Sequence, residues 1–164
     1  KWNSAVLGGK SGVEYARWVR DSKHWGGGVE LAVFAQEFGV ELVAVEVRTQ
    51  RLYRFGEGSG FRRQCFLLWD GIHYDMIVDA TDPSIRQFPT ATQDAEEARR
   101  RETDATALAR QLFDARQFTD VQGMSIMCLD DNTLHKGQKE AVEHAKKTGF
   151  TNFVEFDPKE HKLH

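Results

Sequence analysis

Apolar residues recur at helical spacing in two segments near the start of the chain, residues 12–21 and 29–38. Ser11 and Glu14 have the spacing of a capping box, in which a hydroxyl and a carboxylate each satisfy a backbone N–H at a helix start. Gly39 follows the second segment as a typical helix stop. The pattern therefore predicts two helices before the first strand.

Four later segments have the pattern of strands. Residues 40–47 are apolar nearly throughout and rich in β-branched side chains, which is typical of a central strand covered on both faces. Residues 51–55 predict a second strand, and residues 64–69 and 72–78 predict two more, joined by a tight hairpin turn at Asp70-Gly71. The two helices can cover only one face of the central strand, so we expect a partner polypeptide or an exposed apolar patch on the other face.

The second half of the chain is organised differently. Residues 79–93 contain prolines, threonines and aspartates and are typical of a linker. Residues 94–117 predict one long connecting helix, and residues 118–157 a compact module with a helix of its own. The fold class is therefore mixed α/β, with a small sheet and packed helices in residues 1–78.

Composition narrows the class of protein. The 164 residues carry a net charge of -3, which gives no electrostatic reason to expect a nucleic-acid partner. The longest apolar run, Cys65 to Trp69, is too short to cross a membrane. The two cysteines, Cys65 and Cys128, lie in unlike contexts, which indicates free thiols and a location in the cytosol or the nucleus.

His73 and Asp75 are the strongest candidates for chemistry. On a strand, residues two apart project from the same face, so a carboxylate at 75 can orient the imidazole at 73. An oriented imidazole is what a cysteine nucleophile needs as its base. The same pair is also compatible with an ordinary surface hydrogen bond, and spacing alone does not separate the two interpretations.

The segment from Gly71 to Asp75 resembles the histidine motif of the ovarian tumour (OTU) family of ubiquitin thioesterases. Further similarity to that family and to its subgroup with a C-terminal C2H2 zinc finger lies in Tyr15–Trp18, Trp25–Gly27, Glu30–Leu31, Glu41–Val47, Arg54–Glu57, Gln117–Val121, Glu143–Lys146 and Thr151–Phe153. The resemblance implies that residues 1–78 are the C-terminal half of an OTU catalytic domain, with His73 as general base and Asp75 as its orienting partner. It also implies a structural role for Trp25, Gly26, Gly27, Glu30 and Leu31.

The family's nucleophile lies in an Asp-x-x-Cys segment well before the Trp-Gly-Gly stretch, and nothing before Trp25 matches it. Cys65 is expected to be an inert packing residue, because burial in apolar surroundings raises a thiol pKa. The chain is therefore expected to supply the general base of a deubiquitinase without its nucleophile.

In the tail, Cys128 and His144 match two ligands of the zinc finger of the subgroup that the chain resembles, whereas Asp131 and Phe150 occupy the other two ligand positions. His135, which we place on a turn, is a candidate replacement ligand. We expect a finger that has lost its metal, with no cofactor, and with Phe118, Phe150 and Phe153 packed beneath the tail helix in its place. We expect His24, His161 and His164 on the surface.

The sequence alone is compatible with three functions. The first is part of an active cysteine-type deubiquitinase, the second an inactive module that binds ubiquitin or another protein, and the third a structural subunit of a larger assembly. The expected partners are ubiquitin or polyubiquitin and a polypeptide that completes the OTU core. The resemblance implies one further partner, the valosin-containing AAA ATPase, which the subgroup binds through an N-terminal ubiquitin-like domain.

Overall fold

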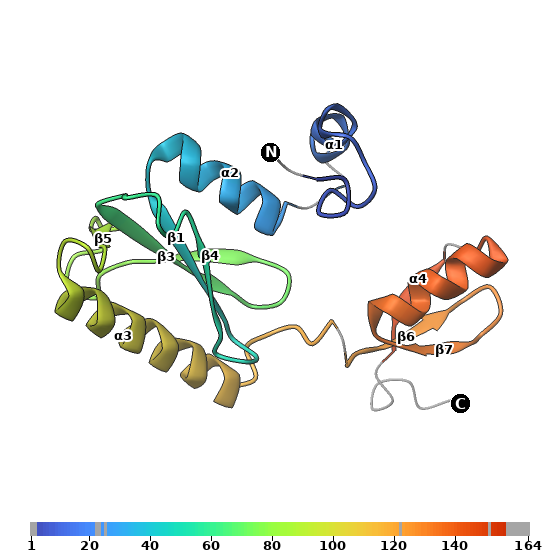
Figure 1. Ribbon diagram of the computed structural model, residues 1–164. Helices are drawn as coiled ribbons and strands as arrows, with labels where there is room; N and C mark the ends of the chain where they lie inside the picture. The colour runs from blue at the N-terminus through green and yellow to red at the C-terminus, as the bar shows by residue number, and fades with distance from the viewer. Residues whose placement is uncertain (1–2, 22–23, 25, 122, 151, 157–164) are drawn as a thin grey trace.

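The computed structural model describes residues 3–21, 24, 26–121, 123–150 and 152–156. Trp25, His161 and His164 lie outside these residues, as does position 151. Within the described part of the chain no helix is long and apolar enough to cross a membrane. Figure 1 shows a larger body, made by the first part of the chain, and a smaller tail module that follows α3.

The two N-terminal helices form close to where the apolar pattern predicts them. Helix α1 is Gly12–Val19, and Ser11 and Glu14 form the predicted capping box at its start. Helix α2 is Gly28–Phe38 and ends at Gly39, which has the left-handed conformation of a helix stop. Glu30 joins the two helices, because it accepts hydrogen bonds from the Tyr15 hydroxyl (2.8 Å) and from the backbone N–H of Gly27 (2.6 Å). Glu30 therefore has the structural role expected of it.

The body contains a mixed sheet of five strands. These are β1 (Glu41–Glu46), β2 (Leu52–Phe55), β3 (Arg63–Trp69), β4 (Tyr74–Ile77) and the short β5 (Phe88–Pro89). The order is β2-β1-β3-β4, with β5 pairing beside β4 on β3. Strands β1 and β3 are parallel and the other pairs are antiparallel. The sheet confirms the predicted mixed α/β class.

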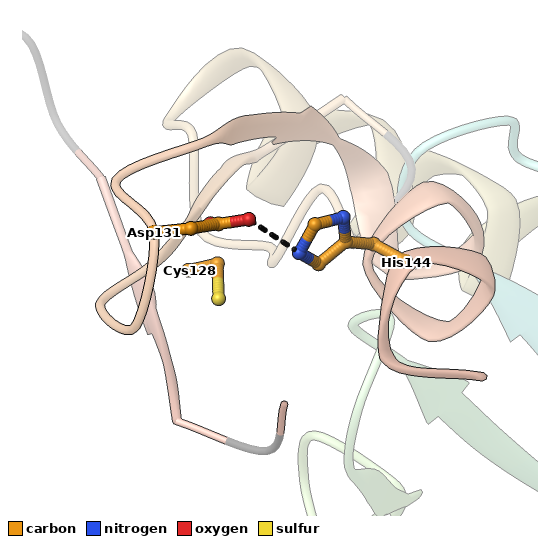
Figure 2. A group of neighbouring side chains, drawn as sticks. All are labelled: Cys128, Asp131 and His144. Carbon is orange, nitrogen blue, oxygen red and sulfur yellow. Dashed lines mark ion pairs between the residues drawn. The ribbon is translucent and has the colours of Figure 1, made fainter. Parts of the chain in front are cut away.

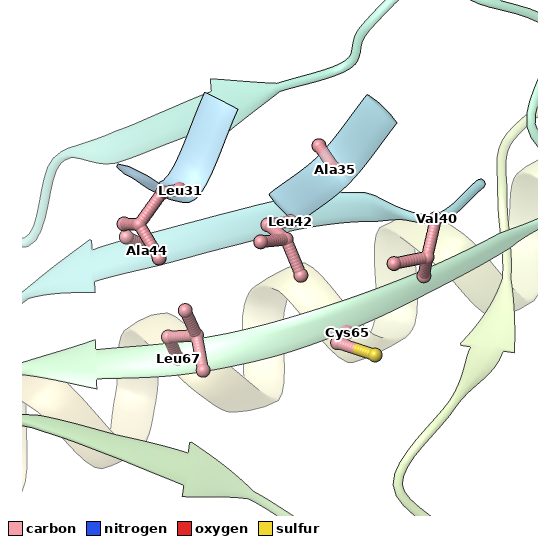
Figure 3. Close-up of a cluster of buried hydrophobic side chains, with 7 residues drawn as sticks. All are labelled: Leu31, Ala35, Val40, Leu42, Ala44, Cys65 and Leu67. Carbon is pink, nitrogen blue, oxygen red and sulfur yellow. The ribbon is translucent and has the colours of Figure 1, made fainter. Parts of the chain in front are cut away.

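The register of β1 on β3 divides the core into two layers. Leu42 pairs with Cys65 and faces α2, where Leu31 and Ala35 complete the layer (Figure 3). The next pair along the strands faces the other side, because side chains alternate along a strand. Val43, Val45, Phe66, Phe88, Ala105 and Ala109 form that second layer.

Helix α3 (Ala95–Asp114) covers the second face of the sheet (Figure 1). Its buried side chains are the small ones, Ala98, Ala105 and Ala109, which allow the helix to lie close to the strands. Val43 and Val45 are fully buried beneath it. The expectation of a partner polypeptide on this face is therefore wrong, because the helix expected to serve only as a connector packs there instead.

The hairpin after β3 is wider than predicted. Trp69 pairs with Tyr74, so the loop contains four residues, 70–73, and the expected two-residue turn at Asp70-Gly71 is wrong. The side chain of Asp70 explains the difference, because its carboxylate accepts the backbone N–H groups of Ile72 (2.8 Å) and His73 (2.7 Å). His73 consequently lies in the loop and not on the predicted strand.

Residues 79–93 are part of the body and not a simple linker. Their β5 pairs with β3, and Phe88 is buried in the second layer of the core. Asp79 accepts a hydrogen bond from Arg101 of α3 at 2.7 Å, so the segment also holds the long helix in place. Polar composition suggested a linker, but its buried residues attach it to the sheet.

The tail is a small module of one helix and three short strands. Strands β6 (Ser125–Cys128), β7 (Leu134–Lys136) and β8 (Phe153–Glu155) form a sheet in the order β7-β6-β8, and α4 (Gly137–Thr148) packs on it. Among the described residues of the module, the buried apolar side chains are Ile126, Cys128 and Ala141. The tail thus has a very small core.

Candidate functional site

The loop that carries His73 is fixed by the segment leading into the tail. The backbone N–H of Thr119 donates to the carbonyl oxygen of Asp70 at 2.8 Å. Gly71 has a φ of +111°, and a Cβ at this position would collide with the carbonyl oxygen of Thr119. Asp120 adds an ion pair to Arg48 at 3.0 Å. Glycine is therefore required at 71 both for its conformation and for the close approach of residue 119.

The structure brings the two predicted site residues together. The Nδ1 atom of His73 lies 3.4 Å from Oδ1 of Asp75, with the histidine in the loop and the aspartate on β4. Both side chains are more than half exposed, at 58% and 66%. This geometry leaves the imidazole accessible to a reacting group and gives it a carboxylate neighbour, so His73 and Asp75 stay the predicted base and its orienting residue.

An apolar groove of about 1060 Å³ opens beside His73. Helices α1 and α2 supply most of its walls, and Ile72, His73 and Tyr74 supply the end. Phe34 and Ile72 line the groove yet remain 47% and 48% exposed. Apolar side chains that line a groove and stay open to solvent are typical of a surface that binds another polypeptide.

Neither cysteine is placed to serve as the nucleophile. Cys65 lies on β3 and is buried in the core layer that α2 covers, where burial raises the pKa of its thiol. Cys128 is fully buried in the tail. These are the two cysteines of the chain, and both are free thiols. The prediction that Cys65 is a packing residue agrees with its position.

A second group of candidate residues gathers in the tail. Cys128 at the end of β6, Asp131 in the following turn and His144 on α4 direct their side chains toward one another (Figure 2). One donor atom of each lies within 4.8 Å of the other two. His144 Nε2 is 3.1 Å from Asp131 Oδ2, while Thr133 donates to Asp131 Oδ1 from its backbone (3.1 Å) and its hydroxyl (2.7 Å). These contacts, first those of Thr133, hold the pKa of Asp131 below its usual value.

His135 lies closer to this cluster than its predicted place on a turn implied. It belongs to β7, and its ring centroid is 4.4 Å from that of His144. Its Nε2 atom is 2.9 Å from the hydroxyl of Thr133, which is also 3.5 Å from Nε2 of His144. No metal-ligand motif includes Thr133, although a hydroxyl two residues after an aspartate is a common turn signal.

The predicted aromatic packing beneath the tail helix is wrong for one of its three rings. Phe118 stacks on Phe113 of α3, with ring centroids 5.2 Å apart. Phe150 is 36% exposed. Phe153 does contact the cluster, because its ring meets those of His144 and His135 at 6.0 and 6.2 Å. The Phe150 ring also meets that of His144, at 6.1 Å, so two of the three rings contact the cluster where apolar burial was expected to replace a metal.

The tail is similar to a known protein family. A family model described as "Ubiquitin thioesterase OTU1, C-terminal C2H2-type zinc finger" matches residues 122–156. The zinc ligands that this description implies are two cysteines and two histidines. Here the cluster supplies one thiol, one carboxylate and one imidazole, and Phe150 has no donor atom. The usual ligand set therefore does not fit this tail as it stands.

The similarity extends over almost the whole chain. The ubiquitin thioesterase OTU1 of Dictyostelium discoideum is 36% identical over 162 residues, which cover 95% of this chain and 48% of the relative. The Danio rerio protein of the same name is 37% identical over 157 residues (94% and 50%), and the Homo sapiens protein 35% over 166 residues (94% and 43%). The chain spans about half the length of these curated relatives.

The fold gives an independent comparison. A solved structure described as "Structure of Ovarian Tumor (OTU) domain in complex with Ubiquitin" matches with a TM-score of 0.62 and 26% sequence identity, over 71% of this chain and 64% of that one. The chain is therefore similar in sequence to ubiquitin thioesterases of the OTU1 type and to their C-terminal C2H2-type zinc finger, and in fold to an OTU domain.

Proposed function

We propose that this chain provides the general base of an OTU-type ubiquitin thioesterase, and that the cysteine nucleophile comes from another polypeptide segment seated in the groove beside His73. The observation that carries this proposal is the His73–Asp75 pair, 3.4 Å apart at the end of an apolar groove. Its substrate is the isopeptide or thioester-like linkage at a ubiquitin C-terminus, in the cytosol or the nucleus.

The chemistry follows from the position of the imidazole. A thiol held in the groove lies within reach of one ring nitrogen of His73, which takes the thiol proton and later returns it to the leaving group. Asp75 stabilises the protonated ring and fixes which nitrogen faces the thiol. The chain's own cysteines cannot take this role, because both are buried away from His73.

The groove is the reason for placing the cysteine-bearing segment beside His73. A helix N-terminus that lowers a thiol pKa must dock through an apolar face, and Phe34 with Ile72 offers an exposed apolar surface next to the base. An association with the valosin-containing AAA ATPase belongs to the same proposal, as a property of the longer protein.

The test mixes the purified chain with the region of the Danio rerio relative that lies outside the match. Hydrolysis of a fluorogenic ubiquitin C-terminal amide is measured for each component and for the mixture. Activity is expected in the mixture alone, and His73→Ala should abolish it while His24→Ala leaves it unchanged. Phe34→Asp should prevent complex formation, whereas Phe38→Asp, on the same helix but outside the groove, should not. Equal activity of the His73→Ala mixture would refute the assignment of the base.

A ubiquitin-binding module without catalysis is the second candidate. It is favoured by the burial of both thiols, at 6% and 0% exposure for Cys65 and Cys128. Titration calorimetry of the chain with ubiquitin separates the two candidates. Binding by the chain alone, together with an inactive but stable complex in the experiment above, would support the module over the thioesterase.

A further inference from the structure

The tail poses a problem of stability that the donor cluster can solve. A module of this size usually needs a disulfide, a metal or a partner, since below about 40 residues the core is too small to stabilise a fold alone. The described residues of the tail bury few apolar side chains, and both cysteines of the chain are free. Phe150, at the position where the family places a ligand, is 36% exposed and does not fill the core. Apolar burial is therefore a poor substitute for a metal here.

We propose that the tail binds one zinc ion through a rebuilt ligand set, Cys128, Asp131, His135 and His144, in which His135 from β7 replaces the histidine missing at Phe150. This set keeps two of the family's ligands, changes a third from thiolate to carboxylate and takes the fourth from a different element. Thiolate, imidazole and carboxylate are all ordinary zinc ligands, and a set of four suits a closed structural site.

Three of the four donors lie near the spacing of tetrahedral coordination, with the His144–Asp131 pair slightly closer than a shared ion requires. Ligand atoms about 2.0–2.3 Å from a shared zinc ion lie about 3.3–3.8 Å from one another. His144 Nε2 and Asp131 Oδ2 are 3.1 Å apart, and Cys128 adds its sulfur so that all three donors lie within 4.8 Å. Cys128 is fully buried beside these groups, which is where a structural thiolate is protected from solvent.

Thr133 prepares the carboxylate for this role. Its N–H and hydroxyl both engage Oδ1 of Asp131, which leaves Oδ2 directed at the cluster. A partner that holds one oxygen of a ligating carboxylate is typical of the groups that surround metal sites. The same hydroxyl is 2.9 Å from His135 Nε2, so that nitrogen is already turned toward the cluster. His135 lies beside the three donors, with its ring centroid 4.4 Å from that of His144, and zinc binding requires β7 to bring this ring to the fourth position.

Metal analysis of the full chain tests the proposal without any assay of activity. The protein is refolded with zinc sulfate, freed of unbound metal by gel filtration and measured by atomic emission. One zinc ion per chain is expected for the wild type and for His24→Ala, a histidine variant outside the tail. His135→Ala should weaken zinc binding by more than about a hundredfold, since even groups around the ligands contribute ten- to a hundredfold. A wild-type chain without zinc overturns the proposal, and so does unchanged affinity in His135→Ala.

A rescue variant separates loss of a ligand from loss of the fold. Phe150→His, added to His135→Ala, restores an imidazole at the family's own position and should return stoichiometric zinc. A double variant that stays free of zinc would mean that His135 acts through the fold of β7 and is no ligand. Cobalt substitution gives a further readout, because a tetrahedral site with one thiolate produces a sulfur-to-cobalt band that Cys128→Ser should remove.

Discussion

At the scale of single residues, the same chemical group lies in two different environments. The Cys65 thiol lies between a strand and a helix, where burial raises its pKa and no cation compensates. The Cys128 thiol is as deeply buried but has a carboxylate and imidazoles beside it. Burial alone therefore does not decide what a cysteine does, and its polar neighbours determine whether it is inert or a ligand.

We predict that Cys65 does not react with iodoacetamide in the native protein, because its thiol is both shielded and protonated. Peptide mapping after a short exposure should find alkylation at this position only when denaturant is added. Ser59→Cys, which places a thiol in an exposed turn, is the positive control. Rapid alkylation of Cys65 without denaturant would contradict the structure.

Gly71 is predicted to be intolerant of any side chain. Gly71→Ala should cost about 1–3 kcal/mol of unfolding free energy for the strained backbone alone, and more because the Cβ meets the carbonyl of Thr119. Gly58→Ala is the matched control, since Gly58 also has a positive φ of +76° but open space around it. Urea unfolding of both variants measures the difference, and equal losses would show that Thr119 does not press on the loop.

At the scale of elements, α3 owes its close approach to alanine. Ala105 and Ala109 are almost completely buried against Val43, Val45 and Phe66. Ala109→Leu should therefore destabilise the protein by about 1–3 kcal/mol through overpacking. Ala107→Leu lies on the exposed side of the same helix and should have little effect. Thermal unfolding of the two variants measures the contrast, and a stabilising Ala109→Leu would mean that the helix lies further from the sheet.

The attachment of α3 should also depend on pH. Hydrogen bonds from Thr81, then from Arg101, hold the pKa of Asp79 well below its usual value. A depressed folded-state pKa means that this carboxylate stabilises the protein above its unfolded pKa of about 3.9 and loses that effect as the pH falls further. Asp79→Asn should therefore lower stability at neutral pH, and the deficit should shrink below about pH 4.

Urea unfolding at neutral pH and at about pH 3 measures the change for Asp79→Asn. Asp104→Asn, an exposed substitution on α3, serves as the control and should leave the unfolding midpoint nearly unchanged. A deficit in Asp79→Asn that stays constant into the acid range would show that the carboxylate is not the group involved.

Much of the element pattern was open to prediction, because apolar period and end signals are local properties of the chain. Ser11 and Glu14 cap the start of α1, and Gly39 ends α2, as these residue types do in other helices. The second layer of the core was not predictable, because Ala105 and Ala109 carry little apolar signal and are buried only through contact with a distant sheet. The length of the loop that carries His73 was also predicted wrongly, because Asp70-Gly71 is a strong signal for a two-residue turn.

The candidate site was predictable only to the extent that it lies within one short segment. His73 and Asp75 are two residues apart in sequence, and they were predicted to meet because both were placed on one strand. They do meet, but His73 lies in the loop before β4 and only Asp75 lies on the strand. The groove next to them combines α1, α2 and the loop, and no local pattern indicates such a contact. Likewise, His135 and His144 belong to different elements that only the folded tail brings side by side.

At the scale of the whole molecule, the body is closed on both faces of its sheet by its own helices, and its main opening among the described residues is the groove. The tail has a separate three-stranded sheet. The two units meet through the backbone of residues 118–120, which contacts the loop that carries His73. The link between them is therefore short but touches the part of the body where chemistry is proposed.

The contact of Thr119 with Asp70 determines at which residue the tail can be replaced by another module. A graft joined directly after α3 removes Thr119, so the carbonyl of Asp70 loses its donor and the loop is free to adopt other shapes. A graft joined after Asp120 keeps the donor and the ion pair to Arg48, and brings in any foreign module without disturbing His73. Residues 118–120, which look like a spacer, thus belong with the body, and the match to the zinc-finger family begins after them, at residue 122.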